Sequence, residues 1–188
     1  MKTIKVLGLC GSLRKASTNM GLLRYARAHA PEGMEVAIAD LSEVPFFNQD
    51  LEKLEERPAA VTRLYNQLEE ADALLLACPE YNYSMAPALK NVLDWASRAK
   101  DNRLLAGKPV AILGSGGGLG SARAQYHLRQ TCVYLDLHPL NKPEIFAKAF
   151  GGGFDDKGNP TDESVQTLIR TLLDKLQDWT EMLSTPDE

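Results

Sequence analysis

The sequence predicts an α/β fold in which a five-stranded, doubly wound parallel sheet carries helices on both faces. Short apolar runs alternate with segments whose apolar residues recur at helical spacing. The run at residues 73–78 is apolar throughout, as expected of a strand buried on both faces. Five strands fit the flavodoxin-like order 2-1-3-4-5 better than the six-stranded dinucleotide-binding order.

Each element is predicted from its own local pattern. The predicted strands are residues 4–9, 34–39, 73–78, 109–113 and 137–140. The predicted helices cover about residues 19–30, 58–70, 87–98, 120–134 and 161–183. Residues 45–50 are expected to be irregular, and no repeat or polar linker interrupts the chain. We therefore expect a single domain over residues 1–188.

Composition excludes several classes of protein. The 188 residues carry a formal net charge of -4, which gives no electrostatic basis for binding nucleic acid or an anionic membrane. No segment is long and apolar enough to span a bilayer and no signal segment is recognised, so a cytoplasmic protein is expected. Cys10, Cys78 and Cys132 are far apart and match neither a disulfide framework nor a zinc site, so we expect buried thiols.

Ligands of such sheets bind beyond the carboxyl ends of the strands, so the loops after the first, third and fourth strands matter most. The first loop, residues 11–19, places Arg14 ahead of Ser17, Thr18 and Asn19 at a helix N-terminus. Such a terminus attracts an anion, hydroxyl groups can donate, and Arg14 can pair with phosphate oxygens. The loop lacks the nucleotide-triphosphate motif, and simple helix capping with solvated charges is the alternative.

The second and third loops suit a flat ligand. Residues 79–87 are bracketed by prolines and combine Asn82 with two tyrosines, which suits a ring rich in heteroatoms; the alternative is a rigid loop that covers the core. Residues 114–120 are rich in glycine, which allows a ligand to approach the backbone closely; the alternative is a flexible loop. Their glycine spacing fails as a dinucleotide fingerprint.

The sequence lacks the residue patterns of nucleophilic, metal-dependent and histidine-based catalysis. The sequence has no nucleophile elbow, and no cluster of residues has metal-ligand spacing. His29, His127 and His138 fall outside the three loops. We therefore predict no catalytic side chain and no metal, which points to a cofactor that supplies the chemistry itself.

Four segments together resemble the NADPH-dependent FMN reductase family, and within it the branch of bacterial quinone and chromate reductases. They are GSLRKASTN at 11–19, PEYNYSMAPALKNVLDW at 79–95, GKPVAILGSGGGLGSARA at 107–124 and NKPE at 141–144. The resemblance extends from Ile4 to about Trp179. The combination is specific, whereas each segment alone is not.

The resemblance implies bound FMN, NADPH or NADH as electron donor, and a small acceptor such as a quinone, an azo compound, free flavin or chromate. It implies that the FMN phosphate is held by Ser12, Arg14, Ser17, Thr18 and Asn19. It further implies that the ribityl chain and ring are lined by Pro79, Glu80, Tyr81 and Asn82, with Ser115, Gly116 and Gly117 near the pyrimidine end.

The resemblance also implies a homodimer or homotetramer, with Arg123, Tyr126 and Glu144 near the subunit contact; surface salt bridges are the alternative for these residues. Residues 151–153 and 155–159 form a loop to which the resemblance assigns no role. Two other functions stay open, namely a one-electron carrier and a non-enzymatic flavin-binding module. A nicotinamide dehydrogenase without flavin is disfavoured because the glycine fingerprint is absent.

Overall fold

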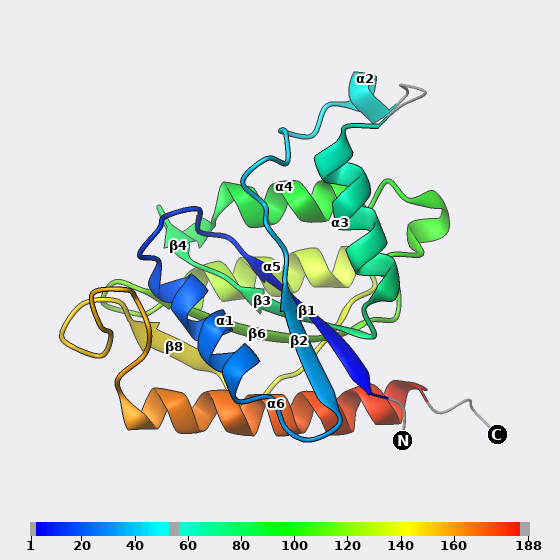
Figure 1. Ribbon diagram of the computed structural model, residues 1–188. Helices are drawn as coiled ribbons and strands as arrows, with labels where there is room; N and C mark the ends of the chain where they lie inside the picture. The colour runs from blue at the N-terminus through cyan, green and yellow to red at the C-terminus, as the bar shows by residue number, and fades with distance from the viewer. Residues whose placement is uncertain (1–2, 53–56, 185–188) are drawn as a thin grey trace.

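The computed structural model describes residues 3–52 and 57–184. Apolar runs form the strands of one sheet, and the segments with helical spacing form the helices around it (Figure 1). The strands are β1 Ile4–Cys10, β2 Met34–Ile38, β3 Ala73–Ala77, β4 Glu80–Tyr81, β5 Ser84–Met85, β6 Pro109–Gly116, β7 His138–Pro139 and β8 Ile145–Lys148. The helices are α1 Thr18–Ala28, α2 Gln49–Glu52, α3 Ala59–Glu70, α4 Pro87–Ala96, a 3₁₀ turn Lys100–Asn102, α5 Ala122–Tyr134 and α6 Glu163–Ser184.

The main sheet has the strand order β2-β1-β3-β6, with parallel pairing throughout. The fifth position is shared by β7 and β8, which both pair in parallel with β6. The flavodoxin-like α/β prediction is therefore confirmed, with one difference in strand count. The sequence indicated β7 but not β8, because β8 has only four residues and lies just after Pro143, which cannot donate to a strand ladder.

The fourth strand is longer than predicted. Residues 114–116 belong to β6, where Gly114, Ser115 and Gly116 pair with residues 146–148 of β8. The expectation that the glycine-rich loop begins at Gly114 is therefore wrong at its first three residues. Glycine disfavours a strand, but pairing with β8 stabilises the strand conformation of these residues.

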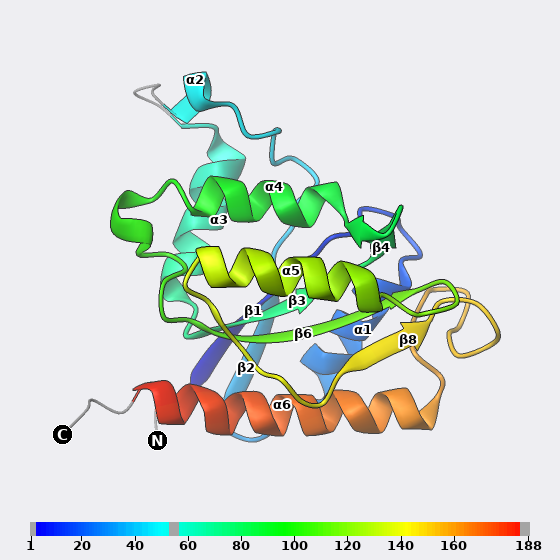
Figure 2. The same ribbon diagram turned by 180° about the vertical axis from the view of Figure 1, so that it is seen from behind.

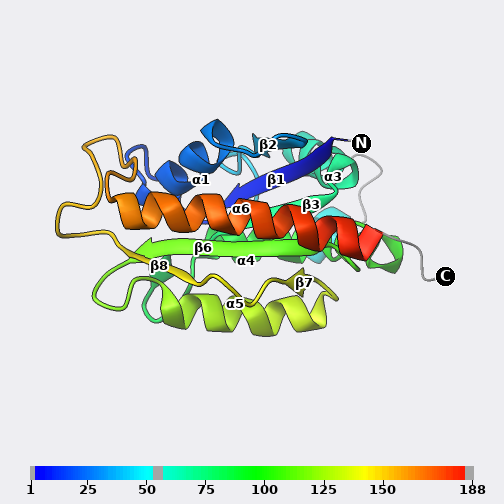
Figure 3. The same cartoon turned by 90° about the horizontal axis from the view of Figure 1, so that it is seen from below.

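Helices cover both faces of the sheet, as predicted. Helices α1 and α6 lie on one side, and α3, α4 and α5 lie on the other (Figures 1 and 2). Side chains of β3 alternate between these layers: Leu75 packs with the α1 and α6 cluster, whereas Leu74 and Leu76 pack on the opposite side. Viewed from below, α6 runs along the sheet beside α1 (Figure 3). No helix of the described residues could cross a bilayer.

The segment between β8 and α6, residues 149–162, packs against α1, and we call it the β8–α6 loop. A Cβ atom at Gly21 would overlap the carbonyl oxygen of Gly158, so the two backbones touch. Arg24 of α1 adds two hydrogen bonds: Nε donates to Asn159 Oδ1 at 2.9 Å and Nη2 donates to the Lys157 carbonyl at 2.7 Å. The loop is thereby held against the first turns of α1.

Gly21→Ala tests this close approach. Helix propensity alone would favour alanine by up to about 1 kcal/mol. The overlap with the Gly158 carbonyl outweighs this gain, so we expect a net loss of about 1–3 kcal/mol in the free energy of unfolding, measured with urea. Gly118→Ala is the control, because a Cβ there meets no atom within 4 Å. Equal stability of the two variants would contradict the packing.

Candidate functional site

A pocket of about 470 Å³ lies at the carboxyl ends of β1, β3 and β6, and we call it the central pocket. Its position is the one that ligands occupy in doubly wound sheets. Eleven of the twelve predicted cofactor-binding residues line it: Ser12, Arg14, Ser17, Thr18, Asn19, Pro79, Glu80, Tyr81, Ser115, Gly116 and Gly117. The twelfth, Asn82, does not line it. The structure thus brings the three predicted loops together around one cavity.

The N-terminus of α1 forms one end of the central pocket. Ser17 is the N-cap, and its hydroxyl oxygen accepts a hydrogen bond from the Met20 amide at 3.2 Å. The capping alternative is therefore correct for this side chain, although its hydroxyl proton is still free to donate. Arg14 is exposed at the pocket and forms no ion pair with any described residue. Helix dipole and guanidinium together make this end attractive to an anion.

Asn19 joins the first loop to the end of β6. Its side-chain amide donates to the Ser115 carbonyl at 3.0 Å, and its Oδ1 accepts from the Ser115 amide at 2.9 Å. The hydroxyls of Thr18 and Ser115 are 2.6 Å apart and form a third hydrogen bond. All three residues are buried. The Asn19 side chain therefore fixes the distance between two walls of the pocket.

The second loop is a two-residue hairpin between β4 and β5. Asn82 and Tyr83 both have positive φ, at 50° and 68°, which is the conformation of a type I′ turn. Asn82, at the tip of this hairpin, does not line the central pocket. Tyr81 lines the pocket, and its hydroxyl lies 3.5 Å from Ser12 Oγ.

Glu80 has a structural task. Its carboxylate accepts hydrogen bonds from the Arg123 amide at 3.1 Å and from Arg123 Nε at 2.6 Å, at the start of α5. The Arg123 guanidinium also lies 3.6 Å from the centre of the Tyr83 ring. The hydrogen bond to the Glu80 carboxylate raises the pKa of Arg123, its partner in this ion pair. It anchors the hairpin to α5.

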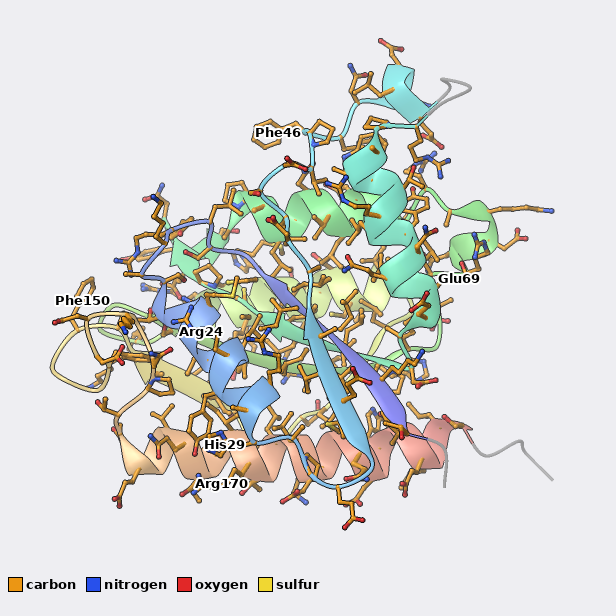
Figure 4. The ribbon with its side chains drawn as sticks, viewed as in Figure 1. Arg24, His29, Phe46, Glu69, Phe150 and Arg170 are labelled. Carbon is orange, nitrogen blue, oxygen red and sulfur yellow. The ribbon has the colours of Figure 1, made fainter. Side chains whose placement is uncertain are left out.

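Sequence reasoning missed one wall of the central pocket. The β8–α6 loop contributes Ala149, Phe150, Phe154, Asp155, Asp156 and Gly158. Phe150 is 80% exposed and stands at the rim, away from the body of the protein (Figure 4). The turn signature of residues 155–159 is visible in the sequence, but its contact with α1 is not.

Asp155 organises this wall. Its Oδ1 accepts hydrogen bonds from the backbone amides of Lys157 at 2.9 Å and Asn159 at 2.7 Å, and its Oδ2 accepts from Asn159 Nδ2 at 3.0 Å. The Asn159 side chain and these amides lower the pKa of Asp155. Its carboxylate is thus occupied by its own loop.

The thiols offer no nucleophile. All three cysteines are buried and unpaired. Burial raises the pKa of Cys78 to about 12 and that of Cys132 to about 12, and it also raises the pKa of Cys10. The expectation of buried thiols is confirmed. None of the three histidines lines the central pocket, and the described residues contain no group of three potential metal ligands.

The residues that the family resemblance connected with subunit contacts fall into two networks. Tyr126 of α5 donates to Glu144 Oε1 at 3.2 Å, and Lys142 donates to Glu144 Oε2 at 2.6 Å. Arg123 pairs instead with Glu80. Tyr126 keeps 55% of its surface exposed, so it can contact another molecule.

The sequence profile of the NADPH-dependent FMN reductase family matches residues 4–151. An NAD(P)H-dependent FMN reductase of Pseudomonas aeruginosa is 50% identical over 181 residues, which cover 96% of this chain and 97% of that protein. A quinone reductase of Escherichia coli is 43% identical over 175 residues, or 92% of this chain and 89% of that protein. The solved structure of FerB, a flavoenzyme NAD(P)H:(acceptor) oxidoreductase from Paracoccus denitrificans, superposes with a TM-score of 0.84 at 30% identity and covers 95% of this chain and 98% of that one. On this evidence, with the fold and pocket already described, the chain belongs to the NADPH-dependent FMN reductase family.

Proposed function

We propose that this protein is an FMN-dependent NAD(P)H oxidoreductase. It passes two electrons from a nicotinamide donor through FMN to a quinone or a similar small acceptor, such as an azo compound, chromate or free flavin. One observation carries the proposal: a single pocket combines an anion-attracting helix terminus, Tyr81 and the carboxyl end of β6. Similarity to the reductases named above supports the same assignment.

The donor groups of the central pocket fit FMN. Arg14, Ser12 and the N-terminus of α1 would hold the phosphate. The Pro79–Tyr81 segment and residues 115–117 would line the ribityl chain and the ring. When bound, FMN supplies the redox chemistry by accepting a hydride and passing on two electrons.

The side chains of this protein bind and orient. Asn19 sets the spacing of the phosphate and ring ends through Ser115, and Glu80 sets the position of the hairpin. Both are positioning residues, and we propose that their side chains do not contact the reacting atoms. Asn82, outside the pocket, contributes through the turn that it forms. No side chain is assigned as general acid or base.

We further propose a homodimer or homotetramer with the exposed face of α5, including Arg123 and Tyr126, together with Glu144, near the contact. Val133 and Tyr134 of the same helix are 81% and 86% exposed, which is unusual for large apolar residues of one helix.

We propose that the whole chain forms one FMN-binding domain, since α6 packs along the sheet and against α1. We also propose a cytoplasmic location, because the cysteines are free and buried and the electron donor is a reduced nucleotide.

The first prediction concerns the reaction. Purified protein loaded with FMN should lose its flavin absorbance on anaerobic addition of NADPH and regain it when a benzoquinone is added. Failure to bind FMN would contradict the cofactor assignment. Bound FMN that no nicotinamide reduces would favour a binding module, and two resolved one-electron steps would favour an electron carrier.

The second prediction concerns the phosphate. Arg14→Ala removes a charge-assisted contact, so the Kd of FMN should rise about ten- to hundredfold, measured by fluorescence titration of the apoprotein. Arg63→Ala is the matched control, because Arg63 lies on α3 and pairs with Glu43 at 2.6 Å, outside the pocket. Equal FMN affinity in wild type and Arg14→Ala would remove Arg14 from the phosphate site.

The third prediction concerns assembly. Light scattering should give two or four times the 20.7-kDa mass of the chain. Tyr126→Asp introduces a charge into the proposed contact and should shift the protein to a smaller assembly. Met182→Asp is the control, since Met182 is an exposed apolar residue of α6. A monomeric wild type, or dissociation by the control instead, would contradict the proposed contact.

A further inference from the structure

Near its start, the β8–α6 loop contains a three-residue segment, Phe150–Gly152, which we call the strap. The residue before the strap is fixed to β6, because the Ala149 amide donates to the Gly116 carbonyl at 2.7 Å. The residue after it is fixed to the end of the loop, because the Gly153 carbonyl accepts from the Thr161 amide at 2.9 Å. The strap therefore connects two fixed points at the wall of the central pocket.

The strap itself has few contacts. Within the part of the chain that the structure describes, the backbone of Phe150 and Gly151 makes no hydrogen bond. Gly151 and Gly152 have φ values of 106° and 93°, a conformation that favours glycine. A Cβ atom at either glycine would meet no atom within 4 Å, so these positions need backbone freedom and not close packing. The strap can therefore change its direction at low cost.

The rest of the loop is held in place. Phe154 and Pro160 form a β-bridge, and the Asp155 carboxylate binds the backbone of the turn between them. Arg24 and the backbone contact at Gly21 fix the same turn to α1. Movement of the β8–α6 loop is thereby confined to the strap.

The one side chain that the strap carries, Phe150, lies beside the ring end of the proposed FMN site. Strands β3 and β8 pair with opposite edges of β6. Tyr81, which follows β3, and Phe150, which follows β8, therefore border the carboxyl end of β6 from two sides, and both line the central pocket. The residue before Phe150 is the one that bonds to Gly116, where we place the flavin ring.

A mostly exposed phenyl ring at this place suits a flat ligand. The faces of an isoalloxazine ring are apolar, and covering them with an aromatic side chain removes apolar surface of both partners from water. Gly116 and Gly117 leave the neighbouring wall without side chains, so a ring that turns inward from the strap meets little obstruction there. The strap gives Phe150 the freedom to make that turn.

A purely structural task for Phe150 is the alternative. The same side chain also lines a cavity of about 330 Å³ between β8 and the start of α6, together with Phe146, Val165 and Leu168. A ring that covered this cavity would be largely buried. Phe150 is 80% exposed with the cavity open beside it, so it does not act as its cover.

We propose that Phe150 is a further FMN-binding residue, and that the strap closes its phenyl ring over bound FMN and slows release of the cofactor. This inference rests on the proposed FMN site in the central pocket. Its consequence is that FMN stays bound between turnovers rather than exchanging as a substrate.

The first test measures the release of FMN by flavin fluorescence after rapid dilution of loaded protein. In Phe150→Ala the dissociation rate should rise about tenfold, because the apolar cover is lost, while the association rate stays within about twofold. Phe150→Tyr keeps the ring and should retain the wild-type rate. Phe46→Ala is the matched control, because Phe46 is 78% exposed, projects from another part of the surface (Figure 4) and does not line the central pocket.

Unfolding in urea distinguishes the structural alternative. We expect the apoprotein of Phe150→Ala to keep the wild-type urea midpoint, since a mostly exposed ring contributes little to folding. A lower midpoint with unchanged FMN release would assign Phe150 to the cavity beside α6 and overturn the inference. A dissociation rate that rises equally in Phe46→Ala would overturn it as well.

Limited digestion of wild type checks closure of the strap without any substitution. Chymotrypsin should cut the apoprotein after Phe150, because this segment is exposed and lacks backbone hydrogen bonds, and saturating FMN should slow that cut about tenfold. Cleavage after other exposed aromatic residues, Phe46 among them, is the reference for any general effect of FMN on stability. Cleavage after Phe150 that FMN leaves unchanged, or slows only as much as the reference, would overturn the inference.

Two outcomes separate this inference from the function on which it rests. Wild type that binds FMN but is not reduced by a nicotinamide would contradict the proposed function and leave the role of Phe150 intact. Wild type that binds no FMN would overturn both.

Discussion

The reciprocal hydrogen-bonded pair between the Asn19 side chain and the Ser115 backbone is the constraint on which the site depends. It satisfies a buried amide donor and acceptor at the point where β6 leaves the core. Each of these groups would cost about 1–3 kcal/mol if it were buried without a partner. The pair therefore fixes the separation of the α1 terminus from the end of β6, and so the separation of the phosphate end from the ring end of the central pocket.

Helix α1 both packs on the sheet and shapes the central pocket. Its apolar side, with Leu22 and Leu23, is buried against the strands. Its N-terminus faces the central pocket, Gly21 admits the β8–α6 loop, and Arg24 holds that loop in place. Because these tasks fall on successive turns, the position of one helix sets two walls of the pocket at once, its own N-terminus and the β8–α6 loop. The buried apolar side supplies the stability that such a short helix lacks alone.

Prediction from the sequence succeeded where local pattern decides the outcome. Continuous apolar runs located β1, β3 and most of β6, and the strand order followed from their number and alternation. The three predicted loops meet at one pocket because parallel strands end at the same edge of the sheet. The resemblance to the FMN reductase family is confirmed.

Prediction from the sequence was incomplete for features that depend on contacts between residues far apart in the chain. The wall formed by the β8–α6 loop depends on a backbone contact between Gly21 and Gly158, which are far apart in the chain. The extension of β6 through Gly116 depends on pairing with β8, whose four residues carry little signal of their own. The contact of the Asn19 side chain with the Ser115 backbone was not predicted, because family resemblance assigned Asn19 only to the phosphate. Which partner a polar side chain selects is a property of the folded chain.

The distribution of charge explains why so many cations gather near the first loop. A phosphate at the α1 terminus would neutralise much of the Arg14 charge, and Arg24 is already held by neutral oxygens of the β8–α6 loop. Lys15 and Arg27 line a neighbouring cavity and not the central pocket, so their charges add to the positive potential at this end without lying against the phosphate itself. The cations near the first loop are therefore divided between the central pocket and its surroundings rather than concentrated at one point.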